Sequence, residues 1–234
     1  MIEMVGFDGD DTLWRSQEYY DDAQAAFEAI LGRYVDLAAE GLRTALLDTE
    51  RGNIALFGYG AKGMALSMIE SAIELTDGRI EARDIHRIVR LAKDVLGHPV
   101  QLLPGIREAV EAVAATHRVV LITKGDLFHQ EAKVAQCGLA GIFHRIEIVS
   151  EKDPATYTRL LQEFGLSPDR FAMVGNSLKS DIAPVVALGG CGVYMPYHST
   201  WEHERLAGFA MGERVVEVAG AEAIPAAIAA LHAA

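Results

Sequence analysis

Short runs of apolar residues recur along the chain, and each one ends in small or polar residues. This pattern is typical of strands that are buried on both faces of a sheet. The runs are MVGF (4–7), RVVLIT (118–123), RIEIVS (145–150), FAMVG (171–175) and GVYM (192–195). Between the later runs, apolar residues recur at helical spacing over 104–116, 126–136 and 154–164. Strands that alternate with helices predict an α/β fold, in which helices cover both faces of a parallel sheet.

The stretch from residue 16 to residue 97 has no strand-like alternation. Its apolar spacing predicts four helices separated at glycines, at about 17–31, 36–50, 62–76 and 81–96, and FGYGAKG (57–63) is the clearest break. Two prolines and two glycines in LGHPVQLLPG (96–105) suit a return linker. We therefore predict a core formed by 1–15 and 98–234, with a smaller helical domain, 16–97, inserted after the first strand. The alanine-rich tail (221–234) predicts a terminal helix.

Charge and composition limit the kinds of partner and the compartment that the sequence predicts. The 234 residues carry a formal net charge of −12, and a protein this acidic repels a nucleic-acid backbone. Two cysteines in unpatterned contexts give no disulfide framework, which fits a reducing compartment. The chain starts with acidic residues where a signal peptide has basic ones, and no apolar run approaches the roughly 18 residues of a membrane span. We expect a cytoplasmic protein that binds neither membranes nor nucleic acid; its oligomeric state is not readable from the sequence.

Three acidic residues follow the first predicted strand, in the stretch DGDD (8–11). In extended geometry Asp8 and Asp10 face one side while Asp11 faces away, and Gly9 leaves the backbone open to a ligand. Ligands of open parallel sheets bind outside the carboxyl ends of the strands, which is where this turn falls. Two carboxylates in one site can divide the roles of nucleophile and acid, with Mg²⁺ offsetting their repulsion. The alternative is a turn in which the aspartates cap a helix.

Three more predicted strands end in residues that suit a phosphate or metal site. Thr123 and the backbone N–H groups that follow it from Lys124 on can bind a phosphate oxygen, and Lys152 is a point charge for a phosphoryl group. Asn176 and Asp181 offer oxygen ligands after the fourth run. Each of these residues could instead have a structural role only, as a helix cap or as a solvated lysine. Their occurrence in this order, each just past a strand, favours a shared site.

Taken together, these strand ends resemble the motifs of the haloacid dehalogenase (HAD) superfamily of hydrolases, most of which are phosphatases. The nucleophile motif DxDxT is similar to DGDDT (8–12), and the family's strand-end Thr or Ser and its Lys are similar to Thr123 and Lys152. The acidic motif GDxxxxD resembles GNSLKSD (175–181). The resemblance spans the chain. It implies a Rossmann-like three-layer core, with 16–97 as the family's helical cap between the first and second motifs.

The resemblance also implies a reaction and a role for each motif residue. Asp8 would attack the phosphorus of a small phosphate ester and form an aspartyl phosphate, and Asp10 would act as acid and then base. Gly9, Thr123, Lys124 and Lys152 would surround the transferring phosphoryl group. Mg²⁺ would bind the Asp8 carboxylate, the Asp10 carbonyl and Asn176, with Asp181 in direct or water-mediated support. Trp14, Tyr59 and Lys62 are candidates for contact with the substrate.

One position departs from the family pattern, because Asn176 stands where the family usually has an acid. The amide removes one negative charge, which lowers metal affinity or abolishes metal dependence. Relatives that cleave carbon–halogen bonds often carry Asn here and work without metal, but they usually lack an acid at the position of Asp10. We therefore expect a phosphatase. The alternatives are a 2-haloacid dehalogenase, a non-catalytic member that only binds ligand, and a phospho-accepting receiver module, whose domains are about half as long.

Overall fold

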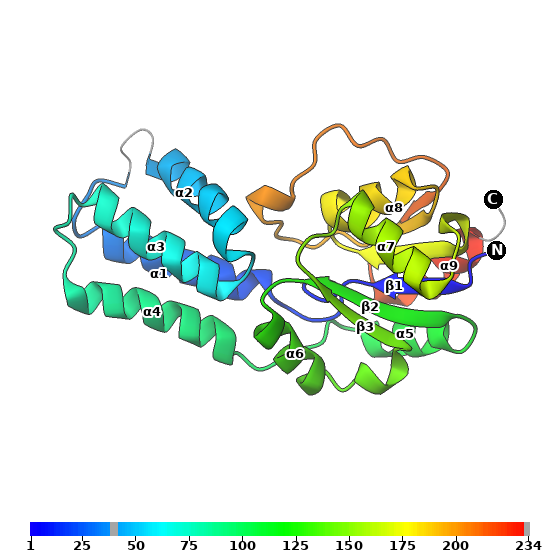
Figure 1. Cartoon of the computed structure of the whole chain (residues 1–234). Helices are drawn as coiled ribbons and strands as arrows, with labels where there is room; N and C mark the ends of the chain where they lie inside the picture. The colour runs from blue at the N-terminus through cyan, green and yellow to red at the C-terminus, as the bar shows by residue number, and fades with distance from the viewer. Residues whose placement is uncertain (38–41, 232–234) are drawn as a thin grey trace. The chain divides into compact units, whose positions relative to one another are not determined.

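The structure is a computed structural model, which describes residues 1–37 and 42–231 (Figure 1). The chain forms two compact units. The first, called the sheet unit below, comprises Met1–Gln17, Val100–Lys124 and Gln130–Ala234. The second, called the helical unit, comprises Glu18–Pro99 and Gly125–His129. No helix in the described part of the chain is both long and apolar enough to cross a membrane.

The sheet unit is built on six parallel strands in the order β3-β2-β1-β4-β5-β6. The strands are β1 (Met4–Phe7), β2 (Arg118–Lys124), β3 (Arg145–Val149), β4 (Phe171–Gly175), β5 (Cys191–Tyr194) and β6 (Val215–Glu217). The first five match the predicted runs to within one residue at each end. Strand β6 was not predicted, because Val215 and Val216 are half-buried and Glu217 is exposed, which leaves no buried apolar run. The chain moves outward in one direction through β2 and β3 and in the other through β4, β5 and β6. The switch point therefore lies between β1 and β4, where ligands bind in such sheets.

Alternating residues of the strands build one core on each face of the sheet. Val5 and Phe7 belong to the core beneath α5 (Ile106–Ala114) and α9 (Ile224–Leu231). Met4 belongs to the core beneath α7 (Pro154–Phe164) and α8 (Ala183–Ala187). Successive side chains of a strand point to opposite faces of the sheet. A strand that is apolar at every position therefore has no polar face, and helices must cover both faces of its sheet. The predicted three-layer α/β fold with a parallel sheet is confirmed.

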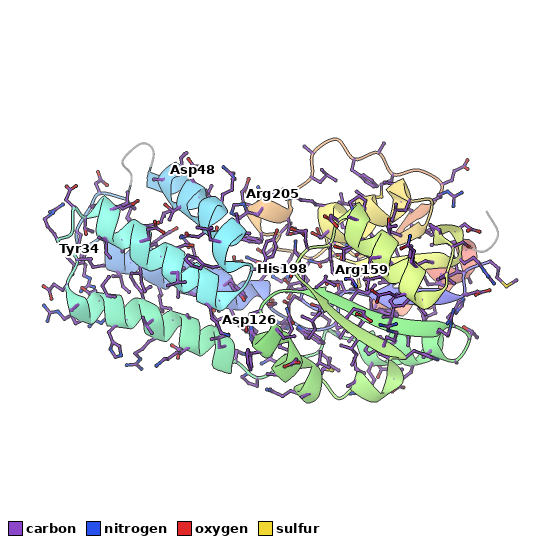
Figure 2. The ribbon with its side chains drawn as sticks, in the orientation of Figure 1. Tyr34, Asp48, Asp126, Arg159, His198 and Arg205 are labelled. Carbon is purple, nitrogen blue, oxygen red and sulfur yellow. The ribbon has the colours of Figure 1, made fainter. Side chains whose placement is uncertain are left out.

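The helical unit contains α1 (Gln17–Leu31), α2 (Leu42–Phe57), α3 (Ala61–Leu75) and α4 (Ala82–Gly97). Its own core includes Phe27, Met68 and Ile88. At the start of α4, the buried Asp84 accepts a hydrogen bond from Tyr34, which is labelled in Figure 2, and it pairs with two arginines of the unit. The unit therefore has apolar and polar contacts of its own.

The second helix differs from the prediction. It was expected over 36–50, but residues 36 and 37 are not helical, residues 38–41 lie outside the described part, and the helix runs on to Phe57. The interior Gly52 does not end it. The neighbouring Asn53 donates a hydrogen bond to Glu70 of α3 at 2.6 Å, which ties this turn to the next helix. The break between α2 and α3 falls within the predicted stretch 57–63. Gly58 and Gly60 form it, with positive φ values of 74° and 113°.

The predicted tail helix is α9, which ends at Leu231; residues 232–234 lie outside the described part.

The two ends of the 16–97 segment are paired within the sheet unit. The Arg15 N–H donates to the carbonyl of Gln101 at 3.0 Å, and the Leu103 N–H donates to the carbonyl of Leu13 at 2.9 Å. Between them, Trp14 forms an antiparallel bridge with Leu102. The chain therefore leaves the sheet and returns to it through one short ladder.

Candidate active site

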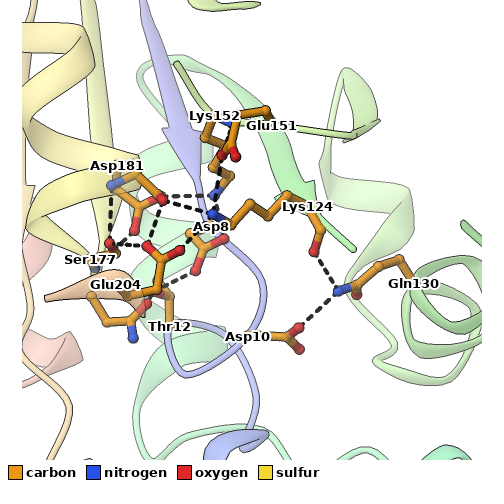
Figure 3. Close-up of polar contacts among 12 residues, drawn as sticks. Asp8, Asp10, Thr12, Lys124, Gln130, Glu151, Lys152, Ser177, Asp181 and Glu204 are labelled. Atoms are coloured by element: carbon orange, nitrogen blue, oxygen red, sulfur yellow. Dashed lines mark hydrogen bonds and ion pairs between the residues drawn. The ribbon is translucent and has the colours of Figure 1, made fainter. Parts of the chain in front are cut away.

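Four strand ends meet at the switch point of the sheet. Asp8 follows β1, and Thr123 is the last residue but one of β2. Lys152 follows β3, and Asn176 follows β4. Asp8 is fixed to the neighbouring strand by its own N–H, which donates to the carbonyl of Val174 at 2.9 Å. Figure 3 shows the polar side chains that gather here. The register of the parallel strands thus places the sequence-predicted residues at one edge of the sheet.

A buried lysine links two carboxylates at the centre of the site (Figure 3). The Lys152 ammonium contacts Asp8 Oδ1 and lies 2.7 Å from Asp181 Oδ1. The other oxygen of Asp181 accepts the Ser177 N–H at 2.9 Å. Gly175 makes room for this arrangement, because a Cβ there would lie 2.3 Å from Asp181 Oδ2. Both oxygens of Asp181 therefore already have a partner, Lys152 or the Ser177 N–H. This favours a role in orienting those groups over direct contact with a metal.

Burial and charge set the protonation of this group. Burial and the charge of Asp181 raise the pKa of Asp8 to about 7, although Lys152 opposes the shift. Burial alone would lower the pKa of Lys152, but the charges of Asp181 and Asp8 outweigh it and raise that pKa above its usual value. Lys152 therefore stays an ammonium at neutral pH. Asp8 takes up a proton more readily than an exposed aspartate does.

Three donors hold the Asp10 carboxylate. The Trp14 indole N–H and the Lys133 ammonium each lie 2.6 Å from Oδ1, and the Gln130 amide lies 2.8 Å from Oδ2. Burial alone would raise the pKa of Asp10, but Lys133 and the other donors bring it below its usual range. Asp10 is thus a carboxylate in the free protein. Asp11 faces the other way, as expected, and its Oδ1 accepts the N–H groups of Ser16 and Gln17 at the start of α1.

Gln130 and Lys133 were missed by the sequence analysis. They lie three residues apart on α6 (Leu127–Gln136), and both are buried. Two polar residues that share one face of a helix close to a strand end were the available signal. Nothing in the sequence showed that this face turns toward Asp10.

The Thr123 hydroxyl is buried and has no hydrogen-bond partner in the described part of the chain. Buried hydroxyls are usually satisfied, so an orphaned one at a strand end is a position for a ligand atom. Gly9 lies against it, because a Cβ at position 9 would come within 2.9 Å of Thr123 Oγ1 and 2.8 Å of the Trp14 ring. The backbone at Gly9 and the hydroxyl of Thr123 are therefore adjacent, as a phosphate cradle requires.

The oxygens around Asn176 fit a magnesium ion. One atom of the Asn176 side-chain amide lies 3.2 Å from Asp8 Oδ2, from the Asp10 carbonyl oxygen and from Thr12 Oγ1. Neighbouring oxygens in an octahedral Mg²⁺ site lie about 3 Å apart, given metal–oxygen distances of about 2.1 Å. With its oxygen turned inward, Asn176 completes such a donor set; with its nitrogen inward, it donates to the same oxygens. Among the described residues, no group of three His, Cys, Asp or Glu side chains that could hold a metal ion is found.

Lys124, expected near the phosphate, is held by two acids. Its ammonium lies 3.2 Å from Glu151 Oε1 and 2.6 Å from Glu204 Oε1, and it also contacts the Ser180 hydroxyl at 3.0 Å (Figure 3). Glu204 comes from the 3₁₀ turn Glu202–Glu204, far beyond the last motif, and it was not among the predicted site residues. Contact between Lys124 and a phosphate stays a prediction.

The three candidates for substrate contact have different surroundings. Trp14 has no exposed surface, and it uses its N–H on Asp10. Tyr59 lies between α2 and α3 and is half-buried. Lys62 pairs with both oxygens of Asp126 at 2.9 Å inside the helical unit. Their contact with a substrate stays a prediction.

The chain is similar to several solved structures. It shares 56% identity with a haloacid dehalogenase-like family hydrolase from Xanthomonas campestris, with a TM-score of 0.88 over 99% of this chain and 92% of that one. A 2-haloacid dehalogenase from Pseudomonas syringae pv. Tomato DC3000 is 21% identical, with a TM-score of 0.63 over 98% of this chain and 99% of that one. The putative HAD-hydrolase YfnB from Bacillus subtilis, described as bound to magnesium, is 14% identical, with a TM-score of 0.58 over 94% and 96%. The last two show the fold alone.

No curated protein sequence matches the chain significantly. The family described as haloacid dehalogenase-like hydrolase matches residues 2–189, which include every motif at the switch point. The chain belongs to the haloacid dehalogenase-like hydrolases.

Proposed function

We propose that the chain is a Mg²⁺-dependent phosphatase that hydrolyses a small phosphorylated metabolite through an aspartyl-phosphate intermediate. The second carboxylate, Asp10, carries this proposal, because three donors hold it two residues after the nucleophile position. An oxygen leaving group needs a proton and a halide does not, so an acid–base group at this position suits a phosphate ester. The orphaned Thr123 hydroxyl supports the same reading as a place for a phosphate oxygen.

Each side chain then has a part in the two steps. The Asp8 carboxylate attacks phosphorus, and the oxygen of the leaving alcohol departs. Lys152 and Thr123 hold the phosphoryl oxygens. Asp10 begins as a carboxylate, takes up a proton from solvent when the anionic substrate raises its pKa, and gives that proton to the leaving oxygen. It then takes a proton from the water that attacks phosphorus, which breaks the bond to Asp8, releases phosphate and restores the Asp8 carboxylate. Mg²⁺, when bound by Asp8, the Asp10 carbonyl and Asn176, would neutralise charge on the phosphoryl group.

The reaction class can be tested with an aryl phosphate. The purified chain is expected to release the phenol in the presence of added Mg²⁺ and to lose this activity with EDTA. A 2-haloacid is the matched probe for the second candidate, which the amide at Asn176 favours. Halide release without turnover of any phosphate ester in a broad panel would replace the phosphatase proposal with a dehalogenase.

Replacing Asn176 with aspartate is expected to tighten Mg²⁺ binding. The change adds a negative charge about 3.2 Å from Asp8 Oδ2, the Asp10 carbonyl oxygen and Thr12 Oγ1, and it removes the amide N–H groups that compete for these oxygens. We expect a Kd for Mg²⁺ lower by about tenfold, measured by calorimetry without substrate. Gln162→Glu is a control, because Gln162 is an exposed amide on α7 and its change to an acid should leave the Kd unchanged. An Asn176→Asp variant with unchanged Mg²⁺ affinity would place the cation elsewhere.

A further inference from the structure

The Glu204 carboxylate enters the site from the loop that follows β5. Its Oε2 accepts the hydroxyls of Ser177 and Ser180 at 2.6 and 2.5 Å, and its Oε1 lies 2.6 Å from the Lys124 ammonium. The Glu204 side chain is 14% exposed, whereas Glu202 on the same turn is 53% exposed. Among the ion pairs found in the described part of the chain, Glu202 pairs only with Arg205, which is labelled in Figure 2. Glu204 therefore contacts residues of the site, whereas Glu202 faces solvent.

The two serines connect Glu204 to the turn that carries Asn176 and Asp181. The Ser177 hydroxyl accepts the N–H of Ser180, which fixes the start of the π-helical turn Leu178–Ile182. The Ser177 N–H in turn donates to Asp181 Oδ2. Glu204 thus closes a continuous hydrogen-bond network around the turn (Figure 3). Such outer contacts orient the groups that bind a metal.

Charge gives Glu204 a second effect. Lys124 is a cation at the same strand ends, and an ammonium there without acidic neighbours would oppose a divalent cation. Glu204 and Glu151 flank that ammonium. Of the two, Glu204 is the more buried, so its interaction with Lys124 is the less screened by solvent.

We propose that Glu204 is a positioning residue for the Mg²⁺ site, which orients the Asn176–Asp181 turn through Ser177 and Ser180 and neutralises Lys124. It supplies from the outer loop part of the negative charge that the amide at Asn176 does not provide. The inference rests on the proposed function, because it assumes that the site binds Mg²⁺.

The test measures Mg²⁺ affinity by calorimetry on the full chain without substrate. Glu204→Gln keeps the shape of the side chain but loses its charge, and Glu204→Ala loses both the charge and the hydrogen bonds. We expect the Kd for Mg²⁺ to rise about tenfold in Glu204→Gln and further in Glu204→Ala. Glu202→Gln is the matched control on the same turn and should bind Mg²⁺ as the wild type does.

Two further variants separate positioning from charge. The double variant Ser177→Ala/Ser180→Ala should weaken Mg²⁺ binding when Glu204 is present. The same two changes should raise the Kd little further when Glu204 is already alanine, because both sets of changes break the same network. Lys124→Met should restore part of the lost affinity in the Glu204→Gln background, since it removes the ammonium that Glu204 had neutralised. Restoration would support the electrostatic part of the inference.

The outcomes are distinguishable. Both Glu204 variants binding Mg²⁺ with the wild-type Kd, even with a lowered Tm, would overturn the inference and leave the proposed function standing. A wild-type chain that binds no Mg²⁺ would overturn the metal dependence of the proposed function, and the inference with it.

Discussion

Asp8→Asn is expected to abolish turnover of the aryl phosphate, with a loss of at least about 10⁴-fold in kcat. The amide is not a nucleophile, so the covalent step has no attacking oxygen of comparable strength. The protein should remain folded, since the substitution removes a buried carboxylate whose pKa stands at about 7. Steady-state kinetics and circular dichroism on the same preparation check both statements.

A matched control is Asp22→Asn, an exposed aspartate on α1. It should leave kcat and KM unchanged. Mass spectrometry of the wild type, quenched during turnover, is expected to find the phosphoryl group on the peptide that contains Asp8. An Asp8→Asn variant that keeps a tenth of wild-type kcat would exclude Asp8 as the nucleophile.

Lys152→Met is expected to cost both stability and activity. The ammonium lies between Asp8 and Asp181, and all three side chains are buried. Removing one partner of a buried ion pair costs about 3–5 kcal/mol, which for a chain of this length lowers the Tm by roughly 10 °C. Activity should fall with it, because Lys152 is the cation assigned to the phosphoryl oxygens. Thermal denaturation followed by kinetics below the variant's Tm separates the two losses.

The stability deficit of Lys152→Met should depend on pH. The pKa of Asp8 is raised in the folded chain, so its contribution to stability is greatest below the unfolded value of 3.8 and is lost as the pH rises through about 7. Without Lys152 that pKa rises further, and ionising Asp8 becomes more costly. The difference in Tm from the wild type should therefore be largest above pH 7 and shrink toward pH 5. Lys93→Met, an exposed lysine on α4, should show no such trend. A deficit that is equal at both pH values would mean that Lys152 acts through packing alone.

The strands were the most predictable part of the fold, because those buried on both faces leave uninterrupted apolar runs. Helix α7 was predicted with both ends correct, since Asp153 and Pro154 mark its start and Gly165 adopts the left-handed conformation at its end. The second helix was misplaced because its continuation past Gly52 depends on a contact with α3. Strand β6 is held by pairing with β5, and three residues carry too little local pattern to reveal that.

The location of the candidate site could be predicted for a similar reason. Residues at strand ends are brought together by the parallel register, which is a property of the fold class. The partners that set their charge come from elsewhere: Lys133 from the face of a helix, and Glu204 from a long loop. Those contacts depend on how the helix and the loop pack, and local sequence does not encode packing. The protonation state of Asp10 followed from Lys133 and was therefore not foreseeable.

The short ladder at residues 13–15 and 101–103 has a consequence for how this chain can change over evolutionary time. Because the two ends of the intervening segment are paired there, the segment acts as one closed loop on the sheet unit, whatever residues it contains. Loop-closure entropy grows slowly with length, by about 0.6 kcal/mol for each doubling. Insertions or deletions between those ends are therefore expected to change the closure cost by little. The ladder would therefore let the length and content of the helical segment vary while the strand ends of the sheet unit keep their places.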